Sequence, residues 1–515
     1  MMMMMIIIII FISSLLVLLA AWLCEKLWWA PVHVQKLMSS QGIKGPSYRF
    51  LHGNTKEISE ARRGSTSKPM EDLSHDIFPR ILPHIYSWKR LYGANFLYWL
   101  GSQPELVVTE PELVKEILSD RKGNYPKIEL QGFSMKLLGD GVSSSKGEKW
   151  ARMRKLANNV FHGECLRGML PAMIESAETM VEAWREHEGK EIEAFEEFRL
   201  LTSEVISRTA FGSNFLEGKN IFEMLIKLAT LVSKNILNVR FPGMSRIIKN
   251  SDELESEKLE EGIRNGIIQI IKKRELQART GEPKSSSRKS DFLEKLLEAN
   301  QENSDNQICI EDMVDECKTF YFAGHETTTS LLGWATLLLA THEDWQERAR
   351  KEVMEVFGQE NPTPYGIARL KIMNMILEET LRLYPPVPYI KRKVEKKNVV
   401  LGNITLPPNI HLYISPLALQ HDPEIWGKDV HEFKPERFAE GVVKATNNHP
   451  IAFLPFGYGP RTCLGLNFAM AEAKIVLSMI LQRYSLALSS SYVHSPVQLF
   501  MLRPKDGVQV ILHRI

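Results

Sequence analysis

The first 24 residues carry no charged side chain, whereas the rest of the chain mixes apolar and polar positions. A bilayer is crossed by about 20 apolar residues, so this run predicts one transmembrane helix. A cleaved signal peptide would begin with basic residues and end in small ones. This run has no Lys or Arg before it, and the bulky Trp28 and Trp29 follow it. We expect an uncleaved anchor over residues 1–24, a linker over 25–50 and one body over 51–515.

Beyond the anchor the spacing of apolar residues is mainly helical from residue 111 to about 357. Apolar residues that recur every three or four positions predict amphipathic helices, here at residues 149–161, 171–186, 194–211, 252–278 and 467–481. Short runs rich in β-branched and aromatic residues predict strands, here at residues 96–99, 105–108, 399–401, 411–415 and 508–513. Residues 61–68 and 279–290 are polar and predict surface loops. The pattern indicates a mainly α fold with small β-sheets in a single large domain.

Composition and charge remove several classes of protein. Hydrophobic residues make up 44% and charged residues 24% of the chain, as in ordinary globular proteins. There are 64 Lys and Arg against 62 Asp and Glu, and a net charge of +2 gives no support for nucleic-acid binding. Five widely spaced cysteines without a CxxC pair argue against a disulfide scaffold and a structural zinc site. A basic excess follows the anchor and predicts that the body faces the cytosol: Lys26, Lys36, Lys44 and Arg49.

The segment 311–341 is apolar over much of its surface, yet its centre reads AGHETTTS. A second membrane span is one interpretation, but a central acid such as Glu326 is expensive in lipid. A helix buried in a protein core fits the pattern better. Gly324 then allows close approach of a large group. Glu326 and Thr327 face that group as buried polar residues, which need a hydrogen-bond partner or a functional role.

The richest pattern in the chain is FGYGPRTCLG at residues 456–465, directly before a predicted helix. Its three glycines and one proline predict a tight turn. Amide N–H groups at a helix start stabilise a thiolate such as that of Cys463. Arg461 adds a positive charge suited to an anionic ligand. From the cysteine alone, a buried structural thiol stays an open interpretation.

Five positions of this segment resemble the haem-binding loop of the cytochrome P-450 monooxygenases: Phe456, Gly459, Arg461, Cys463 and Gly465. The resemblance runs along nearly the whole chain. It implies the cytochrome P-450 fold, haem b (iron protoporphyrin IX) as cofactor and the Cys463 thiolate as axial ligand of the haem iron.

Other landmarks of that family follow in the expected order. The resemblance implies a buried structural network of Glu379, Arg382 and Arg437, from the E-x-x-R and PERF elements. It implies contacts to the haem propionates from Trp150, Arg154, Arg392 and Arg461. For Arg154 and Arg392 a solvated surface charge is the alternative.

The AGHETT segment at residues 323–328 resembles the oxygen-side motif of the same family. There an acid and an alcohol relay the protons that let one oxygen atom leave as water, which implies catalytic roles for Glu326 and Thr327. His325 either touches substrate or packs between helices through a hydrogen bond.

The segments around 317–328 and 344–353 look like the plant clan that includes secologanin synthase and hydroxylases of gibberellins and brassinosteroids. By this analogy the substrate is a hydrophobic terpenoid, steroid or related plant metabolite. We expect substrate contacts from residues 130–138, 231–241, 387–390 and 499–501.

No GxGxxG follows a predicted strand and no P-loop is present, so the sequence predicts no nucleotide site. Resemblance to microsomal members implies the endoplasmic reticulum membrane and an NADPH–cytochrome P-450 reductase through which NADPH and O2 are used. A basic cluster is a candidate docking surface for that reductase, although half of its charges could be ordinary solvated ones: Lys146, Lys149, Arg152, Arg154 and Lys155.

The sequence thus predicts a membrane-anchored haem-thiolate monooxygenase acting on a hydrophobic small molecule. One alternative is a haem-thiolate isomerase or dehydratase, and a second is a non-catalytic haem-binding sensor or steroid carrier. The intact acid–alcohol pair, Glu326 and Thr327, favours the monooxygenase over both.

Overall fold

The computed structural model describes residues 2–213, 215–238, 249–280, 291–301 and 307–515. Two sequence-based expectations fall partly outside these ranges. They are the polar loop at 279–290, from residue 281 onward, and the last three residues of the expected substrate segment 231–241.

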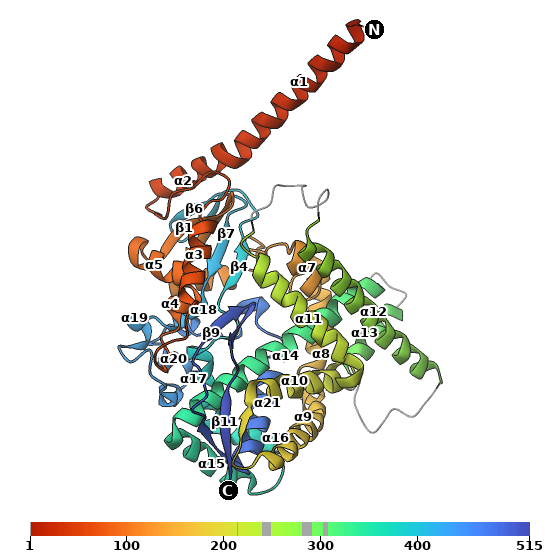
Figure 1. Ribbon diagram of the computed structural model, residues 1–515, viewed down its shortest axis with the longest axis vertical. Coiled ribbons are helices and arrows are strands. Elements are labelled where there is room, and N and C mark those ends of the chain that lie inside the picture. Colours follow the sequence, from red (N-terminus) through yellow and green to blue (C-terminus); the bar gives the residue numbers. More distant parts are fainter. Residues whose placement is uncertain (1, 214, 239–248, 281–290, 302–306) are drawn as a thin grey trace.

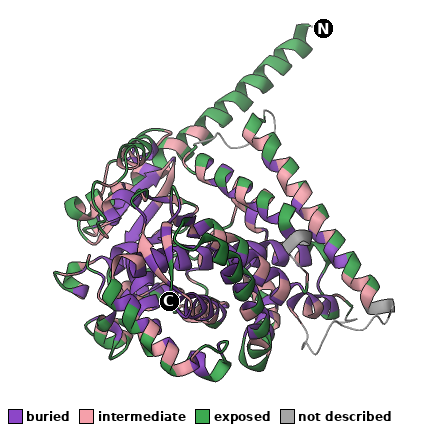
Figure 2. Cartoon of the chain, turned by 60° about the horizontal axis from the view of Figure 1, so that its bottom comes forward, coloured by how far each residue is buried: buried purple, intermediate pink, exposed green. Residues whose placement is uncertain are grey.

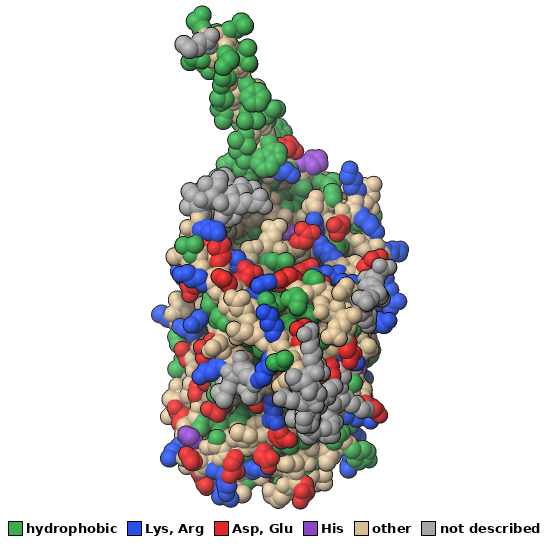
Figure 3. All heavy atoms as spheres, turned by 90° about the vertical axis from the view of Figure 1, so that its right-hand side faces the viewer, with side chains coloured by type: hydrophobic (Ala, Val, Ile, Leu, Met, Phe, Trp, Pro, Cys, Tyr) green, Lys and Arg blue, Asp and Glu red, His purple; other side chains and the backbone are tan. Residues whose placement is uncertain are grey.

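The N-terminal helix α1 (Met2–Cys24) projects from the body of the molecule (Figure 1), and none of its residues is buried. It continues through one π-helical turn (Glu25–Trp29) into α2 (Ala30–Ser40). Among the described residues, Met2–Ser40 is the one helix long and apolar enough to cross a membrane. Figure 3 shows that the side chains of this helix are almost all hydrophobic, whereas the surface of the body carries both basic and acidic side chains.

The expected linker is helical in its first half and packed against the body in its second half. Ile43 and Tyr48 are buried in a core shared with the strands. The Tyr48 hydroxyl donates a 2.5 Å hydrogen bond back to the carbonyl of Leu27. At Gly45 a Cβ atom would lie 1.8 Å from the carbonyl oxygen of Leu97, so only glycine fits there. The end of the anchor is therefore joined closely to the first strand.

The body is built around α14 (Ile310–Thr341), whose residues are mostly buried. This helix packs against α10 (Ala194–Ala210), α17 (Lys371–Leu383) and α21 (Leu466–Leu481). Figure 2 shows the buried residues gathered in these central elements and the exposed residues on the surrounding ones. The other helices of four or more residues are α3 (Thr55–Ser65), α4 (Phe78–Ile81), α5 (Pro83–Tyr92), α6 (Pro111–Leu118), α7 (Gly132–Leu138), α8 (Gly147–Val160), α9 (Gly163–Ala183), α11 (Phe215–Asn235), α12 (Ser251–Thr280), α13 (Phe292–Gln301), α15 (Glu343–Phe357), α16 (Pro364–Arg369), α18 (Pro416–Gln420), α19 (Pro423–Trp426), α20 (Val442–Ala445) and the 3₁₀ turns Trp184–His187 and Pro435–Phe438.

In the described part of the chain, four small sheets flank the helices. The largest has the order β1-β2-β7-β4, in which β2 and β7 are parallel and the other pairs antiparallel. A three-stranded sheet has the order β3-β11-β8, and two hairpins pair β9 with β10 and β5 with β6. The strands are β1 (Asn95–Leu100), β2 (Gln103–Val108), β3 (Glu191–Glu193), β4 (Ile390–Lys393), β5 (Val399–Leu401), β6 (Ile404–Leu406), β7 (His411–Ile414), β8 (Tyr484–Leu488), β9 (Pro496–Leu499), β10 (Met501–Pro504) and β11 (Gln509–Arg514).

The predicted fold class, mainly helical with small sheets, is confirmed. The largest difference concerns residues 61–68, which were expected to form a surface loop. Residues up to Ser65 belong to α3, a surface helix with Thr55 and Ile58 buried against the body. Its basic residues Arg62 and Arg63 lie in the last turn, where they complement the helix dipole. A polar, basic run is therefore compatible with a helix end, and the loop prediction was wrong for residues 61–65, while residues 66–68 form a turn.

Candidate active site

The cysteine loop lies between the 3₁₀ turn Gly459–Arg461 and the start of α21. The Cys463 amide donates a 2.8 Å hydrogen bond to the carbonyl of Phe456, which closes the loop. Gly459 has φ +71°, and a Cβ there would lie 2.3 Å from the carbonyl oxygen of Leu118. Glycine is therefore required by both backbone conformation and space. The closed loop presents the Cys463 thiol to an internal cavity.

This cavity measures about 300 Å³ and lies between the cysteine loop, α8, α14 and the segment before β4. Most of its walls are apolar. Phe161, Ile206, Ala323, Gly324, Leu331, Pro386, Val387, Phe456, Leu464 and Phe468 line it together with Thr327 and Cys463. Burial raises the pKa of the Cys463 thiol, while the Gly465 N–H and the charges of Arg154 and Lys127 act in the opposite direction. Two cations therefore lie near the sulfur, but together with the Gly465 N–H they lower the pKa of the thiol by less than burial raises it.

Four cations also line the cavity: Lys127, Arg154, Arg392 and Arg461. Their side chains donate hydrogen bonds to backbone carbonyls, at 2.5 Å from Lys127 to Ser143, 2.6 Å from Arg154 to Thr462, 3.0 Å from Arg392 to Lys391 and 2.8 Å from Arg461 to Ser145. Within the described ranges, none of these four cations forms an ion pair with a carboxylate at 4 Å or less. The Arg461 guanidinium stacks 4.1 Å above the ring of Trp150, whose buried indole N–H has no hydrogen-bond partner among the described residues.

The pKa values reflect this unbalanced charge. Burial lowers the pKa of Arg392 to about 10. Burial, together with the charges of Arg392 and Arg154, lowers the pKa of Arg461 to about 10. Burial, Arg392 and Arg461 lower the pKa of Lys127 to about 7. Buried cations that lower one another's pKa values require an anionic partner. A haem fits these residues because it brings two carboxylates, a large apolar ring and an iron for a thiolate.

Lys127 was not among the residues that the sequence pointed to. It lies in the loop between α6 and α7, and no motif or spacing connects it with Cys463. Arg154 and Arg392 were predicted here, with a solvated surface charge as the alternative; both line the cavity instead of projecting into solvent.

On α14, the hydroxyl of Thr327 faces the cavity and donates a 2.8 Å hydrogen bond to the carbonyl of Ala323. The neighbouring Glu326 is buried and is not part of the cavity wall. Burial raises its pKa, but His325, Arg503 and Arg199 outweigh that effect, so the pKa of Glu326 is lowered and the carboxyl is ionised. Glu326 thus forms a charged group just behind the wall that carries Thr327.

His325 packs within the helix bundle. Its Nδ1 lies 3.0 Å from the carbonyl of Tyr321, its Nε2 lies 3.2 Å from Glu326 Oε1, and Phe222 packs against its ring. Gly324 was expected to make room for a large group, and it is also close to α10. A Cβ at this position would lie 2.7 Å from Ile206 Cδ1. The glycine therefore permits the close packing of α10 on α14 as well as contributing to the cavity wall.

The three residues expected to form a structural network do so. Arg382 donates two 2.7 Å hydrogen bonds to the two oxygens of Glu379, and both side chains are completely buried. Arg437 Nε lies 3.5 Å from the same carboxylate. Arg382 also donates to the carbonyls of Gln420, Val430 and Glu432, which ties α17 to the chain that follows α18 and α19. We refer to Glu379, Arg382 and Arg437 as the α17 brace.

The expected basic cluster on α8 does not form one surface. Lys149 makes ion pairs of 2.9 Å with Asp140 and 2.8 Å with Asp312. Lys146 pairs with Glu129 at 3.0 Å, and Arg154 lines the cavity. Lys155 is exposed. The cluster is thus divided among three environments.

The segments expected to contact substrate meet beside the main cavity. A second cavity of about 250 Å³ shares Lys127, Val387, Ile390 and Arg392 with it. Leu130 and Leu138 come from the first expected segment, Val387 and Ile390 from the third, and Phe500 and Met501 from the fourth. The described part of the second segment, residues 231–238, does not contribute to this wall.

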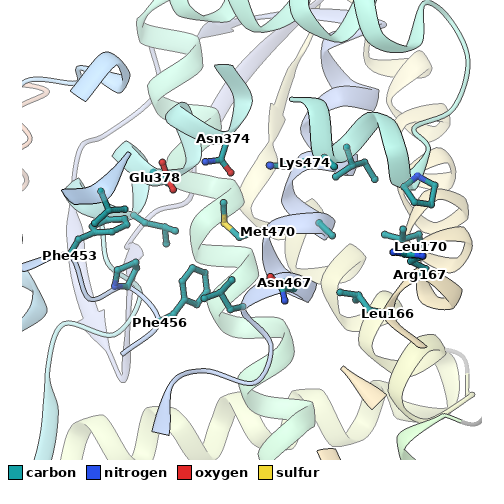
Figure 4. Close-up of a pocket in the computed structure, with 18 of the residues that line it drawn as sticks. Leu166, Arg167, Leu170, Asn374, Glu378, Phe453, Phe456, Asn467, Met470 and Lys474 are labelled. Atoms are coloured by element: carbon teal, nitrogen blue, oxygen red, sulfur yellow. The ribbon is translucent and has the colours of Figure 1, made fainter. Parts of the chain in front are cut away.

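A third hollow of about 620 Å³ lies on the other side of the cysteine loop (Figure 4). Pro455, Phe456 and Gly457 line both this hollow and the main cavity, so the loop forms a shared wall. In Figure 4 Glu378 and Asn374 from α17 and Lys474 from α21 border the hollow above Met470.

Comparison with known proteins agrees with this geometry. The sequence profile of the family described as Cytochrome P-450 matches residues 81–511. Cytochrome P-450 CYP749A22 of Panax ginseng is 53% identical over 487 residues, which cover 94% of this chain and 92% of that protein. The 7-deoxyloganic acid hydroxylase of Catharanthus roseus is 40% identical over 504 residues. The echinocystic acid 23-monooxygenase of Saponaria officinalis is 39% identical over 499 residues. Each of these two matches covers 95% of this chain and 95% of the relative. The chain therefore belongs to the cytochrome P-450 family of haem-thiolate oxidoreductases.

Proposed function

We propose that this enzyme is a monooxygenase that inserts one oxygen atom from O2 into a terpenoid or steroid, using electrons that an NADPH–cytochrome P-450 reductase delivers. One observation carries the proposal. The Cys463 thiol and the Thr327 hydroxyl open into the same apolar cavity, and four cations without carboxylate partners line that cavity.

In this proposal the Cys463 thiolate would hold the iron of haem b, and Phe456, Gly459 and Gly465 shape the loop that carries it. Arg154, Arg392, Arg461 and the Trp150 indole N–H would bind the two propionates together with Lys127. A metal-bound thiol is deprotonated, so the nearby charges of Arg154 and Lys127 then stabilise the thiolate.

The haem supplies the oxygen-activating chemistry when bound. The protein contributes positioning and proton transfer. Thr327 holds a hydroxyl proton at the cavity wall, and its acceptor, the Ala323 carbonyl, fixes the direction of Oγ1. Glu326 is ionised behind that wall and can take up a proton and return it. The apolar walls exclude bulk water, which limits loss of oxidising equivalents to solvent.

The substrate class rests on the cavity walls and on the relatives. The second cavity, lined by Leu130, Leu138, Val387, Phe500 and Met501, is suited to a rigid apolar skeleton. Lys127 and Arg392 border both cavities, and in the proposal their charges are already matched by the propionates. The names of two relatives give terpenoid acids, 7-deoxyloganic acid and echinocystic acid, as what they hydroxylate.

Membrane attachment and electron supply belong to the same proposal. The apolar helix Met2–Ser40 anchors the enzyme in the endoplasmic reticulum membrane with its body in the cytosol. The reductase approaches the outer side of the cysteine loop, where Pro455, Phe456 and Gly457 line both the third hollow and the main cavity. Lys155 is the one member of the α8 basic cluster whose exposure suits docking, among the described residues.

The decisive experiment compares the wild-type enzyme with Cys463→Ala in microsomes. We expect the reduced, carbon monoxide-treated wild type to give the strongly red-shifted Soret band of a thiolate-ligated haem, and the variant to lose it. The wild type with reductase, NADPH and O2 should then oxidise at least one compound from a panel that begins with 7-deoxyloganic and echinocystic acids. A normal thiolate spectrum with peroxide rearrangement in the absence of reductase would instead support the isomerase, and haem binding without turnover would support the carrier.

A further inference from the structure

Three metal-binding side chains from distant parts of the sequence meet beside the α17 brace. Asp76 precedes α4, His421 follows α18 and His431 follows α19. One ligand atom of each lies within 4.8 Å of the others. Figure 1 shows α4, α18 and α19 together on one side of the molecule. None of the three residues lines the main cavity.

His421 is arranged as a metal ligand. Its side chain is buried, with 4% exposure. Its Nε2 lies 2.9 Å from the carbonyl of Leu383. A carbonyl can only accept a hydrogen bond, so Nε2 carries the proton and Nδ1 of the neutral ring has a free lone pair. That Nδ1 is buried, and the described parts of the chain offer it no hydrogen-bond partner. Metal-binding histidines commonly donate their other N–H to a backbone carbonyl in this way.

One side chain, that of Arg382, fixes the backbone before His421 and on both sides of His431. Arg382 donates to the carbonyl of Gln420, the residue before His421, at 3.1 Å. It also donates to the carbonyls of Val430 and Glu432, which flank His431, at 2.7 and 3.2 Å. The two imidazole rings are held with their centroids 5.5 Å apart. A preorganised pair of ligands loses little conformational entropy on binding.

Asp76 completes the group from the N-terminal part of the chain. Its Oδ1 lies 3.7 Å from His431 Nε2. The preceding residue, His75, is fixed by a 2.7 Å hydrogen bond between its Nδ1 and the hydroxyl of Tyr384. The position of Asp76 is therefore set by the same end of α17 that holds the histidines.

Charge also favours metal binding. The carboxylate of Asp76 brings a negative charge to the group. The positive charge of Arg382 is matched by its two hydrogen bonds to Glu379, so it does not stand alone against a dication.

We propose that Asp76, His421 and His431 bind one divalent transition-metal ion of the Zn²⁺ type, with water at the remaining position. Two imidazoles and one carboxylate suit Zn²⁺, with bonds of about 2.0–2.2 Å. The ligand atoms lie up to 4.8 Å apart and must move closer together, and the side chains of His431 and Asp76, 38% and 39% exposed, have the freedom to do so. The spacing of the cysteines argued against a zinc site, but this group uses no cysteine.

Such an ion cross-links the segment before α4 to the two segments held by Arg382. Its role is structural, because the site is separate from the cavity of the proposed reaction, and the inference does not depend on the proposed substrate. Since the ion binds the folded chain only, it raises the unfolding temperature.

The test uses the full-length, haem-loaded enzyme without a polyhistidine tag, treated with EDTA and then freed of it. Isothermal titration with zinc chloride measures stoichiometry and affinity. We expect one Zn²⁺ per wild-type chain and an affinity at least about tenfold lower in Asp76→Asn and in His431→Gln, since loss of a direct ligand weakens binding at least as much as loss of a residue behind it. Zn²⁺ should raise the unfolding temperature of the wild type and not that of either variant.

His449→Gln is the matched control. His449 is also partly exposed and has a carboxylate neighbour, Glu112, at 3.9 Å, but no third ligand was found beside it in the described parts of the chain. This variant should bind Zn²⁺ like the wild type. The carbon monoxide spectrum of every variant verifies that the haem domain is folded. Equal Zn²⁺ affinity in wild type, Asp76→Asn and His431→Gln would overturn the site, and so would the absence of stoichiometric binding in the wild type.

Discussion

Arg154 donates a 2.6 Å hydrogen bond to the carbonyl of Thr462, the residue directly before Cys463. This contact joins α8 to the cysteine loop, while the guanidinium remains in the wall of the main cavity. One side chain therefore supports the backbone that carries the thiol and also supplies charge beside it. The two effects can be separated by substitution.

Arg154→Lys keeps the charge but cannot keep the geometry of the planar guanidinium, and Arg154→Met removes the charge. If both roles matter, haem content should fall in the order wild type, Arg154→Lys, Arg154→Met. We expect a loss of about 1–3 kcal/mol of haem affinity for Arg154→Met, typical of a buried charge-assisted hydrogen bond. Haem per protein, measured from absorbance after purification, gives the order. Identical haem contents in the three proteins would mean that Arg154 does not contribute to haem binding.

Lys127 should make haem binding pH-dependent. Burial, Arg392 and Arg461 lower its pKa to about 7, and two nearby propionates would raise it again. Haem binding therefore takes up a proton above pH 7, and haem affinity falls as the pH rises from about 6.5 to 8.5. Arg stays charged over this range, so Lys127→Arg should lose this part of the dependence. Titration of haem-depleted protein at several pH values measures the slope, and equal slopes in both proteins would contradict the assignment.

Thr327→Ala should uncouple NADPH consumption from product formation, because the hydroxyl that faces the cavity is lost while the buried Glu326 is untouched. We expect more peroxide per NADPH and about 10²–10⁴-fold less product, the range of a positioned proton donor. Thr327→Ser keeps the hydroxyl and should restore most of the coupling. Full coupling in Thr327→Ala would place proton delivery on another group.

The parts of the site that could be predicted from sequence are those encoded locally. The loop from Phe456 to Gly465 and the α14 turn at Thr327 each position their residues through neighbours a few positions away, so a motif suffices. Lys127 reaches the same cavity from a loop with no motif, and only tertiary packing brings it there.

The members of the α8 cluster lie in different surroundings for a related reason. Lys149 and Arg154 are close in sequence, but five residues turn a helix by about 140° beyond one full circle. Lys149 therefore pairs with Asp140 and Asp312 on one side, and Arg154 enters the cavity on the other. The number of charges in a short stretch of sequence does not show that Lys149 and Arg154 lie on different sides of the helix. The loop prediction for residues 61–68 had the same weakness. Burial of Ile58 against the body stabilises α3, and this contact cannot be read from the polar residues around it.

The α17 brace should be worth several kcal/mol. Glu379→Gln leaves Arg382 with an uncompensated charge at a completely buried position, and breaking such a pair costs about 3–5 kcal/mol. The carbonyls of Gln420 and Val430 would lose a fixed donor at the same time. Denaturant unfolding followed by haem absorbance measures the loss. Glu182→Gln, which removes an exposed pair with Arg185 on the surface of α9, is the control and should change little.

Gly324 provides a final test, of the packing that shapes the cavity. A Cβ at this position would lie 2.7 Å from Cδ1 and 2.9 Å from Cγ1 of Ile206, so Gly324→Ala forces α10 or its side chain to move. Overpacking of this kind costs about 1–3 kcal/mol of the free energy of unfolding. Ile206→Ala removes both clashing atoms but leaves a hole of its own.

The double variant Gly324→Ala, Ile206→Ala should therefore be less destabilised than the sum of the two single variants, by more than about 0.5 kcal/mol, which is the sign of direct coupling. Gly64→Ala in α3 is the matched control for the change from Gly to Ala. A Cβ there meets no atom within 4 Å, so this substitution should be neutral or stabilising by up to about 1 kcal/mol. Strict additivity of Gly324→Ala and Ile206→Ala would mean that the two helices do not touch at this point. Gly324 would then be required only by what occupies the cavity, as its place in the AGHETT segment first indicated.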